Sequence, residues 1–252
     1  MKIVASIQVR MGSSRFPGKV MHLVAGKPLL GHLLDRLALS QRLDGIVVAT
    51  AVGKENDVIE AYCTQRNSAC FRGSENDVLD RTLKALQSLE ATIGVEIFGD
   101  CPLIDPVIVD EIIHAFLTDP KNPDFVGNDM KTTYPPGMEV EVFKVSALED
   151  AAKRISDPTI REHGTLFIRQ NPSLYCIRNV EAPPKYQMPH LELEVDTEED
   201  VFVVTAILEH FAGRSDFSLD EIIAFMKSRS DLSATNAAVP RRWKEFREGG
   251  DA

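Results

Sequence analysis

The sequence has few of the features that mark secreted, membrane and metal-cluster proteins. Its 252 residues include only four cysteines, none in a CxxC pair or a Cys/His array, which argues against a disulfide framework or a zinc site. No apolar run approaches the roughly 20 residues that a membrane helix needs. The N-terminal MKIVASIQVR is too short and too soon interrupted for a signal peptide. These absences predict a cytoplasmic protein with reduced thiols and no membrane partner.

Positive charge is also scarce, with 28 lysines and arginines against 38 aspartates and glutamates, a net charge of -10. This balance argues against a nucleic-acid partner, which requires a basic face. It does not exclude a small anionic ligand, because a local cationic loop can act inside an acidic protein. The chain is long enough for one large α/β domain with a sizeable core.

Hydrophobic patterns alternate between strands and helices up to about residue 120. Apolar runs predict strands over 2–9, 45–50, 69–73 and 94–98. Helical spacing of apolar residues predicts helices over 27–41, 54–66 and 78–89. The alternation predicts an α/β fold in three layers, a mostly parallel sheet with helices on both faces.

The regular alternation of strands and helices ends after about residue 120, where the segments TDPKNPDFVGN and TTYPPG are rich in turn residues. We expect strands over 138–143 and near 174–180 and 191–195, and helices over 146–156, 159–170, 197–211 and 218–229. We interpret 120–170 as an insertion or arm on a single domain that covers 1–230. Residues 231–252 hold few apolar side chains besides Trp243 and Phe246, and we expect a loosely ordered tail.

The loop QVRMGSSRFPGK, directly after the first strand, concentrates positive charge and flexible backbone. Arg10, Arg15 and Lys19 are cations that bind phosphate oxygens well. Its glycines let backbone N–H groups approach an anion, and Ser13 and Ser14 add hydroxyls. Since ligands bind beyond the carboxyl ends of strands in open α/β sheets, the loop is a candidate phosphate site. An ordinary solvated loop is the alternative, because neither the Walker A pattern nor GxGxxG is present.

Two aspartates are candidate magnesium ligands. Asp100 follows the predicted strand 94–98, so it should lie at the same sheet edge as the cationic loop. A carboxylate beside a polyanion site is a natural Mg²⁺ ligand, and Asp105 with Pro106 already accounts for the start of the next helix. Asp196 ends the predicted strand 191–195 and is either a second ligand or only a helix cap, since Thr197 and Asp200 could form a capping arrangement themselves.

Taken together, these stretches resemble the cytidylyltransferase family that includes CMP-sialic acid and CMP-KDO synthetases, and most closely its SpsF-like branch. The similar segments occur in the same order: IQVRMGSSRFPGK, RGSENDVLDR (72–81), GDCPLIDP (99–106), TYPPGMEVEVF (133–143), REH (161–163) and VDTEED (195–200). The resemblance spans about residues 2–210 and is therefore far more specific than any single motif.

The resemblance implies a Rossmann-like nucleotidyltransferase fold with a small dimerisation arm, and a homodimer. It implies attack of an acceptor oxygen on the α-phosphate of CTP, with Mg²⁺ as cofactor, a sugar acid of the nonulosonic type as acceptor, and a glycan or polysaccharide pathway. The implied nucleotide-binding residues are Arg10, Met11, Gly12, Ser13, Arg15, Lys19, Asp77 and Arg81. Arg15, Lys19 and Asp100 would be catalytic, and Asp100 and Asp196 would bind the metal. Displacement at phosphorus depends more on charge neutralisation than on a protein nucleophile, which agrees with this residue set.

The acceptor side is less well marked. The candidate acceptor-binding residues are Tyr134, Glu141, Arg161 and His163. His163 is slightly better explained as a structural histidine, and Glu141 could equally belong, with Glu139, to the polar face of an alternating strand. Acids also stand where the SpsF-like branch usually carries a base, at Glu96, Glu192 and Glu194. Either the acceptor therefore differs from the usual sugar acid or the activity is weakened.

Three rival functions remain at this point. One is a nucleotidyltransferase that uses another nucleotide or a phosphorylated acceptor. Another is a nucleotide-binding homologue that has lost turnover. The third, a metal-dependent glycosyltransferase, is the weakest, because DCP is not a DxD motif.

Overall fold

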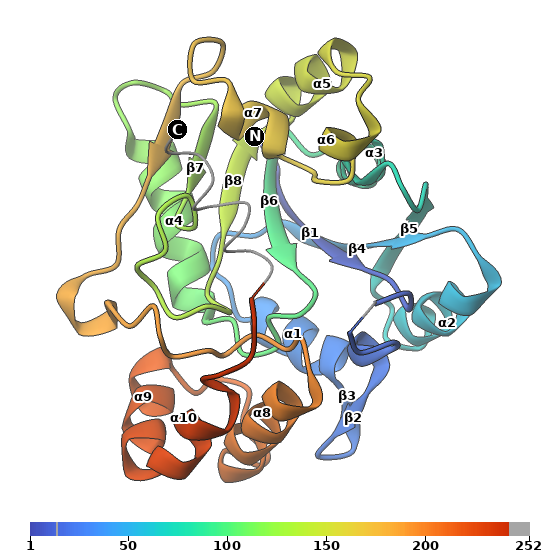
Figure 1. The fold of residues 1–252 in the computed structure, drawn as a ribbon. Helices are drawn as coiled ribbons and strands as arrows, with labels where there is room; N and C mark the ends of the chain where they lie inside the picture. The colour runs from blue at the N-terminus through green and yellow to red at the C-terminus, as the bar shows by residue number, and fades with distance from the viewer. Residues whose placement is uncertain (14, 242–252) are drawn as a thin grey trace.

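The computed structural model describes residues 1–13 and 15–241, so Ser14, Trp243 and Phe246 lie outside the described residues. Within this part, a seven-stranded mixed sheet with the order β5-β4-β1-β6-β8-β7-β9 runs through the molecule (Figure 1). A two-residue hairpin, β2 (Leu23–Val24) and β3 (Lys27–Pro28), lies apart from it.

Four parallel strands form one half of the sheet, as the apolar runs predict. They are β1 (Ile3–Val9), β4 (Gly45–Ala51), β5 (Ala69–Gly73) and β6 (Ile93–Phe98). Helices connect them, which is the usual crossover between parallel strands. All the loops that follow these strands therefore leave from the same edge of the sheet.

The other half of the sheet is built by the segment that we interpret as an arm. It contains β7 (Phe125–Gly127), β8 (Glu141–Lys144) and β9 (Ile177–Asn179), with β8 antiparallel to both β6 and β7. Residues 120–170 thus extend the main sheet and carry helices of one outer layer, so most of this segment belongs to the core domain.

Helices cover both faces of the sheet and confirm the three-layer α/β/α architecture (Figure 1). One face packs against α1 (Leu29–Leu37), α2 (Asp57–Gln65), α4 (Pro106–Thr118), α8 (Glu198–His210), α9 (Leu219–Ser228) and α10 (Ser230–Asn236). The other face packs against α3 (Val78–Ser88), α5 (Val145–Arg154) and α7 (Leu166–Gln170), with α6 (Pro158–Arg161) beside α3 and α7. Short 3₁₀ turns occupy Lys19–Met21, Lys54–Asn56 and Pro184–Tyr186.

Two sequence-based predictions of secondary structure are wrong. The helix over 159–170 is two short helices, because the chain turns at Gly164, where an added Cβ would lie 2.6 Å from Oε2 of Glu96. Residues 191–195 form no strand and include a bend at Glu194. Of the expected loose tail, residues 231–236 belong to α10, which packs against α8 and α9 and buries Leu232, and Arg241 is buried beyond it; residues 242–252 lie outside the described residues.

None of the helices in the described ranges combines the length and the apolar character needed to cross a bilayer.

Candidate active site

The candidate site begins where β1 and β6 end side by side. Gln8 pairs with Phe98 in the parallel register, so the loop after β1 and the turn at Gly99–Asp100 leave the sheet as neighbours. Gly99 is required there, because a Cβ would lie only 2.5 Å from the carbonyl oxygen of Gln8. Gly18 turns the loop back with a φ of 74° and donates its N–H to the Met11 carbonyl. This turn returns Lys19 to the edge of the sheet.

The ammonium group of Lys19 lies between the two predicted metal-binding aspartates. Its Nζ is 2.9 Å from Oδ2 of Asp100, 3.0 Å from Oδ1 of Asp196 and 2.7 Å from the carbonyl oxygen of Val195. Arg15 also pairs with Asp196, and it donates to the carbonyl oxygen of Pro240 at 2.9 Å. The two carboxylates, nearly a hundred residues apart in sequence, are therefore within two hydrogen-bond lengths of each other.

The charges in this group stabilise one another. Burial alone would lower the pKa of Lys19, but the charges of Asp100 and Asp196 and its hydrogen bonds to them outweigh burial and raise the pKa above its ordinary value. Burial alone would raise the pKa of Asp100, and the Lys19 ammonium outweighs it and lowers that pKa. Lys19 therefore stays protonated, and Asp100 stays ionised, at physiological pH.

The structure excludes one of the two roles considered for Asp196, that of a helix cap. Thr197 and Asp200 form the capping box of α8, so Asp196 does not cap that helix. Asp200 accepts the backbone N–H of Asp196 at 2.9 Å, and Arg241 holds Asp200 with two hydrogen bonds of 2.9 and 2.7 Å. The backbone of Val195 donates to the carbonyl oxygen of Asp100 at 2.8 Å. These contacts direct the Asp196 carboxylate toward Lys19 and the cleft.

The two aspartates fit a divalent cation that shares its coordination with a nucleotide. Mg²⁺ in nucleotide enzymes is commonly held by one or two carboxylates plus phosphate oxygens and water. Asp100 and Asp196 offer such a pair, at the position where the Lys19 ammonium already shows that a cation is stabilised. Among the described residues, no group of three or more His, Cys, Asp or Glu side chains is arranged to hold a metal ion, here or elsewhere, so the two aspartates alone would hold one only together with phosphate oxygens and water.

A continuous cleft opens beside this group. Its larger cavity encloses about 410 Å³, and a neighbouring cavity extends it to Ser13 and Lys19. Both cavities share Gln8, Arg10, Arg15, Phe98, Asp100 and Asp196 as lining residues. The cleft thus joins the cationic loop to a deeper chamber over β6 and β8.

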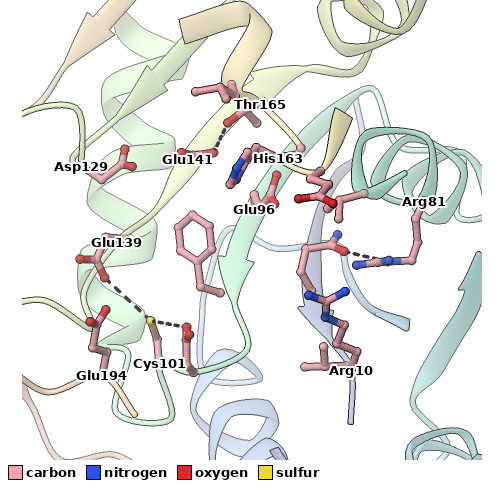
Figure 2. Close-up of a pocket in the computed structure, with 18 of the residues that line it drawn as sticks. Arg10, Arg81, Glu96, Cys101, Asp129, Glu139, Glu141, His163, Thr165 and Glu194 are labelled. Carbon is pink, nitrogen blue, oxygen red and sulfur yellow. Dashed lines mark hydrogen bonds between the residues drawn. The ribbon is translucent and has the colours of Figure 1, made fainter. Parts of the chain in front are cut away.

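The deeper chamber is lined by opposite charges on opposite sides. Figure 2 shows Arg10 and Arg81 toward one side and acids toward the other, with Glu96 and His163 in between. The labelled acids on that side are Asp129, Glu139, Glu141 and Glu194. All four, like Glu96, are less than 10% exposed, so they form a wall of buried carboxyl groups rather than a solvated face.

Most of these acids have hydrogen-bonding partners. Glu141 accepts from Thr165 Oγ1 at 2.6 Å and from Arg169 at 2.7 Å, and Arg169 also pairs with Asp129 at 2.9 Å. Glu139 accepts the backbone N–H of Gly137 at 2.7 Å. Burial raises the pKa of Glu141 well above its usual value, reinforced by Asp129 and opposed by Arg169. Burial also lowers the pKa of His163.

The structure brings most of the predicted site residues to the cleft. Those that line it are Arg10, Ser13, Arg15, Lys19, Arg81, Asp100, Glu141, His163 and Asp196. Arg81 is also anchored, since it donates to Gln8 and to the carbonyl oxygens of Ser74 and Glu75. Met11 and Gly12 lie in the loop, where the Met11 N–H donates to Asn56.

Three other candidates do not line the cleft. Asp77 caps α3 by accepting the N–H of Asp80, and it pairs with Arg161 at 2.8 Å, so the two candidates hold α6 against α3. Tyr134 is buried near Tyr186, with ring centroids 6.4 Å apart. Binding roles for these three residues stay predictions that would require ligand-induced movement.

Several lining residues are absent from the sequence-based site. Gln8, Cys101, Asp129, Thr165 and Arg169 all line the deeper chamber. Gln8 could have been found, because it is a polar residue inside an otherwise apolar strand directly before the cationic loop. Cys101 directly follows the predicted ligand Asp100. Asp129, Thr165 and Arg169 give no local signal, since only the packing of α7 and the β7–β8 segment brings them to the chamber.

Comparison with known proteins agrees with this geometry. Residues 4–236 match the cytidylyltransferase family. The spore coat polysaccharide biosynthesis protein SpsF of Bacillus subtilis is 32% identical over 241 residues, covering 94% of this chain and 98% of that protein. A cytidylyltransferase structure from Leptospira borgpetersenii superposes with a TM-score of 0.88 at 30% identity, covering 96% of this chain and 100% of the other.

A more distant structure supports the fold. CMP:2-keto-3-deoxy-manno-octonic acid synthetase in complex with CTP superposes with a TM-score of 0.62 at 19% identity, over 84% of this chain and 100% of that one. At this identity the likeness concerns the fold alone. The family match over nearly the whole chain and the full-length similarity to SpsF show that this protein belongs to the cytidylyltransferases, enzymes that transfer a cytidylyl group from CTP.

Proposed function

We propose that this cytidylyltransferase is Mg²⁺-dependent and transfers CMP from CTP to a sugar acid, for the synthesis of a surface polysaccharide or glycan. Two comparisons support the acceptor class and the pathway. The relative SpsF is named for spore coat polysaccharide synthesis, and the CTP complex of similar fold is a synthetase for a sugar acid.

One observation carries the proposal: Lys19, Asp100 and Asp196 meet at the end of the cleft that the cationic loop borders. In our proposal, Arg10, Arg15 and Lys19 bind the triphosphate. They would neutralise negative charge as the pyrophosphate leaves, which is where electrostatic catalysis has its largest effect in phosphoryl transfer.

The proposed reaction forms one phosphorus–oxygen bond and breaks another. An acceptor hydroxyl oxygen bonds to the α-phosphorus of CTP, and the bond from that phosphorus to the bridging oxygen of the β-phosphate breaks. The bridging oxygen leaves with the electron pair as part of pyrophosphate, and the hydroxyl proton passes to solvent. The chain's own part is to orient the two substrates and to hold positive charge beside the leaving group.

Asp100 and Asp196 are the residues that would hold Mg²⁺. The ion would supply Lewis-acid stabilisation of the phosphate charge. Because Lys19 contacts both carboxylates, binding of the metal and the nucleotide requires Lys19 to exchange these partners for phosphate oxygens. Removal of divalent cations with a chelator should therefore abolish turnover, and added Mg²⁺ should restore it.

The direct test is pyrophosphate release from CTP and Mg²⁺ with a panel of sugar acids and sugar phosphates. We expect release with at least one sugar acid, and we expect Lys19→Ala to weaken CTP binding by calorimetry far more than Lys121→Ala, which removes an exposed lysine outside the cleft. Release only with phosphorylated acceptors would contradict the acceptor class. Tight CTP binding without any release would favour the non-catalytic alternative.

We also propose a homodimer, on the strength of the family resemblance. Light scattering that shows only monomers at micromolar protein concentration would contradict it. A cytoplasmic location stays a prediction.

A further inference from the structure

One buried carboxylate, that of Asp200, holds the backbone at the start of α8. Its Oδ2 accepts the N–H groups of Asp196 and Thr197, each at 2.9 Å, and its side chain is fully buried. The bond to Thr197 belongs to the capping box, but Asp196 lies one residue outside the helix. The bond to Asp196 is therefore not needed to begin α8. It fixes the backbone of a predicted metal ligand instead.

Two residues from the C-terminal segment 236–241 keep Asp200 in place. Arg241 donates two hydrogen bonds to its carboxylate, at 2.9 and 2.7 Å, and Asn236 donates one at 2.9 Å. Asn236 also donates to the carbonyl oxygen of Glu192 at 3.2 Å. Both side chains are buried, and a bidentate pair between an arginine and a carboxylate has a fixed geometry. The position of Asp200 is thus set by residues about 40 positions later in the chain.

Arg241 also gives a role to two acids that depart from the family pattern, Glu192 and Glu194. Their carboxylates lie 3.4 and 3.7 Å from its guanidinium group. From the sequence alone, these acids indicate either a different acceptor or a weakened activity. In the structure they face a buried arginine from the segment that leads to Asp196, and a buried arginine requires carboxylate partners. Arg241 therefore braces this segment along its length.

The same C-terminal segment contacts the cationic loop. The carbonyl oxygen of Pro240 accepts from Arg15 at 2.9 Å, and Arg15 pairs in turn with Asp196. Arg15 lines both cavities of the cleft, whereas Pro240 and Arg241 are not among the described residues that line them. Arg241 thus lies behind the site, and it can act on the reaction only through the residues that it holds.

Resting on the proposed function, we propose that Arg241 is a positioning residue for the metal site, acting through Asp200 on Asp196. Mg²⁺ demands near-ideal octahedral geometry, so a carboxylate that binds it must be held in one place. Residues that orient a metal ligand from behind typically contribute about 10- to 100-fold to metal affinity or activity. The acids Glu192 and Glu194 belong to the same support, because they hold Arg241.

The test measures divalent-cation binding rather than turnover. Mn²⁺, which oxygen ligands also bind, is titrated into the protein with CTP and without an acceptor. The proton relaxation rate of water distinguishes Mn²⁺ bound to the protein from Mn²⁺ bound to CTP alone. We expect Arg241→Met to raise the Kd for Mn²⁺ by about tenfold or more. Arg241→Lys keeps the charge but loses the planar fork, so it should raise the Kd less.

A second measurement separates the metal from the nucleotide. Calorimetry with CTP in the presence of a chelator should give nearly the wild-type Kd for CTP in both variants, because Arg10, Arg15 and Lys19 are all retained. A general loss of folded protein would weaken both kinds of binding together.

Arg36 provides a matched control. It is an equally buried arginine, held by the carbonyl oxygens of Ile104, Ser215 and Phe217, and it is not among the described residues that line the cleft. Arg36→Met and Arg36→Lys should therefore destabilise the fold without changing the Kd for Mn²⁺. Far-UV circular dichroism shows which of the variants are folded.

The possible outcomes separate this inference from the proposed function. An unchanged Kd for Mn²⁺ in Arg241→Met, or an equal rise in Arg36→Met, would overturn the inference and leave the proposed function intact. If Arg241→Met does not fold, the comparison of Arg241→Lys with Arg36→Lys decides in the same way. A wild-type protein that binds no Mn²⁺ in the presence of CTP would overturn both the inference and the proposed magnesium dependence.

Discussion

The buried Glu96 carboxyl makes the stability of this protein depend on pH in a way that one substitution isolates. Its pKa is raised from 4.5 to about 7 by burial, opposed by Arg81 and Arg169. The folded state therefore holds the Glu96 proton more tightly than the unfolded state does. By linkage, this group lowers the free energy of unfolding as pH rises from about 4.5 to about 7, with no further loss above that range.

The size of the effect follows from the difference between the two pKa values. Each unit is worth about 1.4 kcal/mol, so an ionised Glu96 costs about 3 kcal/mol at pH 8 and less than about 1 kcal/mol at pH 5. Glu96→Gln has nearly the shape of the protonated acid and cannot ionise. It should therefore stabilise the protein by up to about 3 kcal/mol at pH 8 and have little effect at pH 5. Relief of the repulsion felt by Glu141 acts in the same direction.

Urea denaturation of both proteins at pH 5 and pH 8 measures this difference, provided that the slopes of the transitions agree. Glu209→Gln, on the exposed surface of α8, serves as the control and should change little with pH. The reasoning would be refuted if the stability difference between Glu96→Gln and the wild type were the same at both pH values.

Three further predictions concern the nucleotide end and its support. Asp100→Asn should preserve the far-UV circular dichroism spectrum but reduce pyrophosphate release by a factor of about 100 or more, because metal-assisted charge stabilisation is worth several kcal/mol; near-normal release would exclude Asp100 as a ligand. Lys19→Ala should raise the Kd for CTP by about tenfold in calorimetry and leave acceptor KM nearly unchanged, and the opposite pattern would place the phosphates elsewhere. Arg241→Met should lower the free energy of unfolding by about 3–5 kcal/mol, because it removes the buried partner of Asp200. Arg229→Met, which removes an exposed ion pair, should change it little, and equal effects in the two variants would contradict a structural role for Arg241.

Sequence patterns were enough to predict the parallel half of the sheet. There, the period of the apolar residues identifies each element, and the direction of the chain fixes the edge at which its loops lie. A continuous apolar run predicts β1, and parallel strands end at one edge, so the positions of the cationic loop and Asp100 follow from the sequence. The start of the helix at Asp105 and Pro106 follows from the same local chemistry and is confirmed by the hydrogen bond that Asp105 accepts from the Val107 N–H. The family resemblance added the nature of the reaction.

The remainder depended on contacts between residues distant in sequence. From the sequence, Asp196 could equally be a helix cap or a ligand. Only the tertiary structure shows that it does not cap α8 and that its carboxylate lies beside Lys19 and Asp100. Glu141 alternates with apolar residues as an exposed strand residue would, and the alternating pattern does not reveal whether its polar face meets solvent or a cavity.

The sequence by itself therefore determined the parallel half of the sheet and the cationic loop, because these depend on residue type and local period, and the resemblance that its motifs carry indicated the reaction. Only the tertiary structure decided the acid-lined chamber and the meeting of Lys19 with its two carboxylates. Burial and long-range pairing set the electrostatics of such a site, and neither is encoded in the spacing of neighbouring residues.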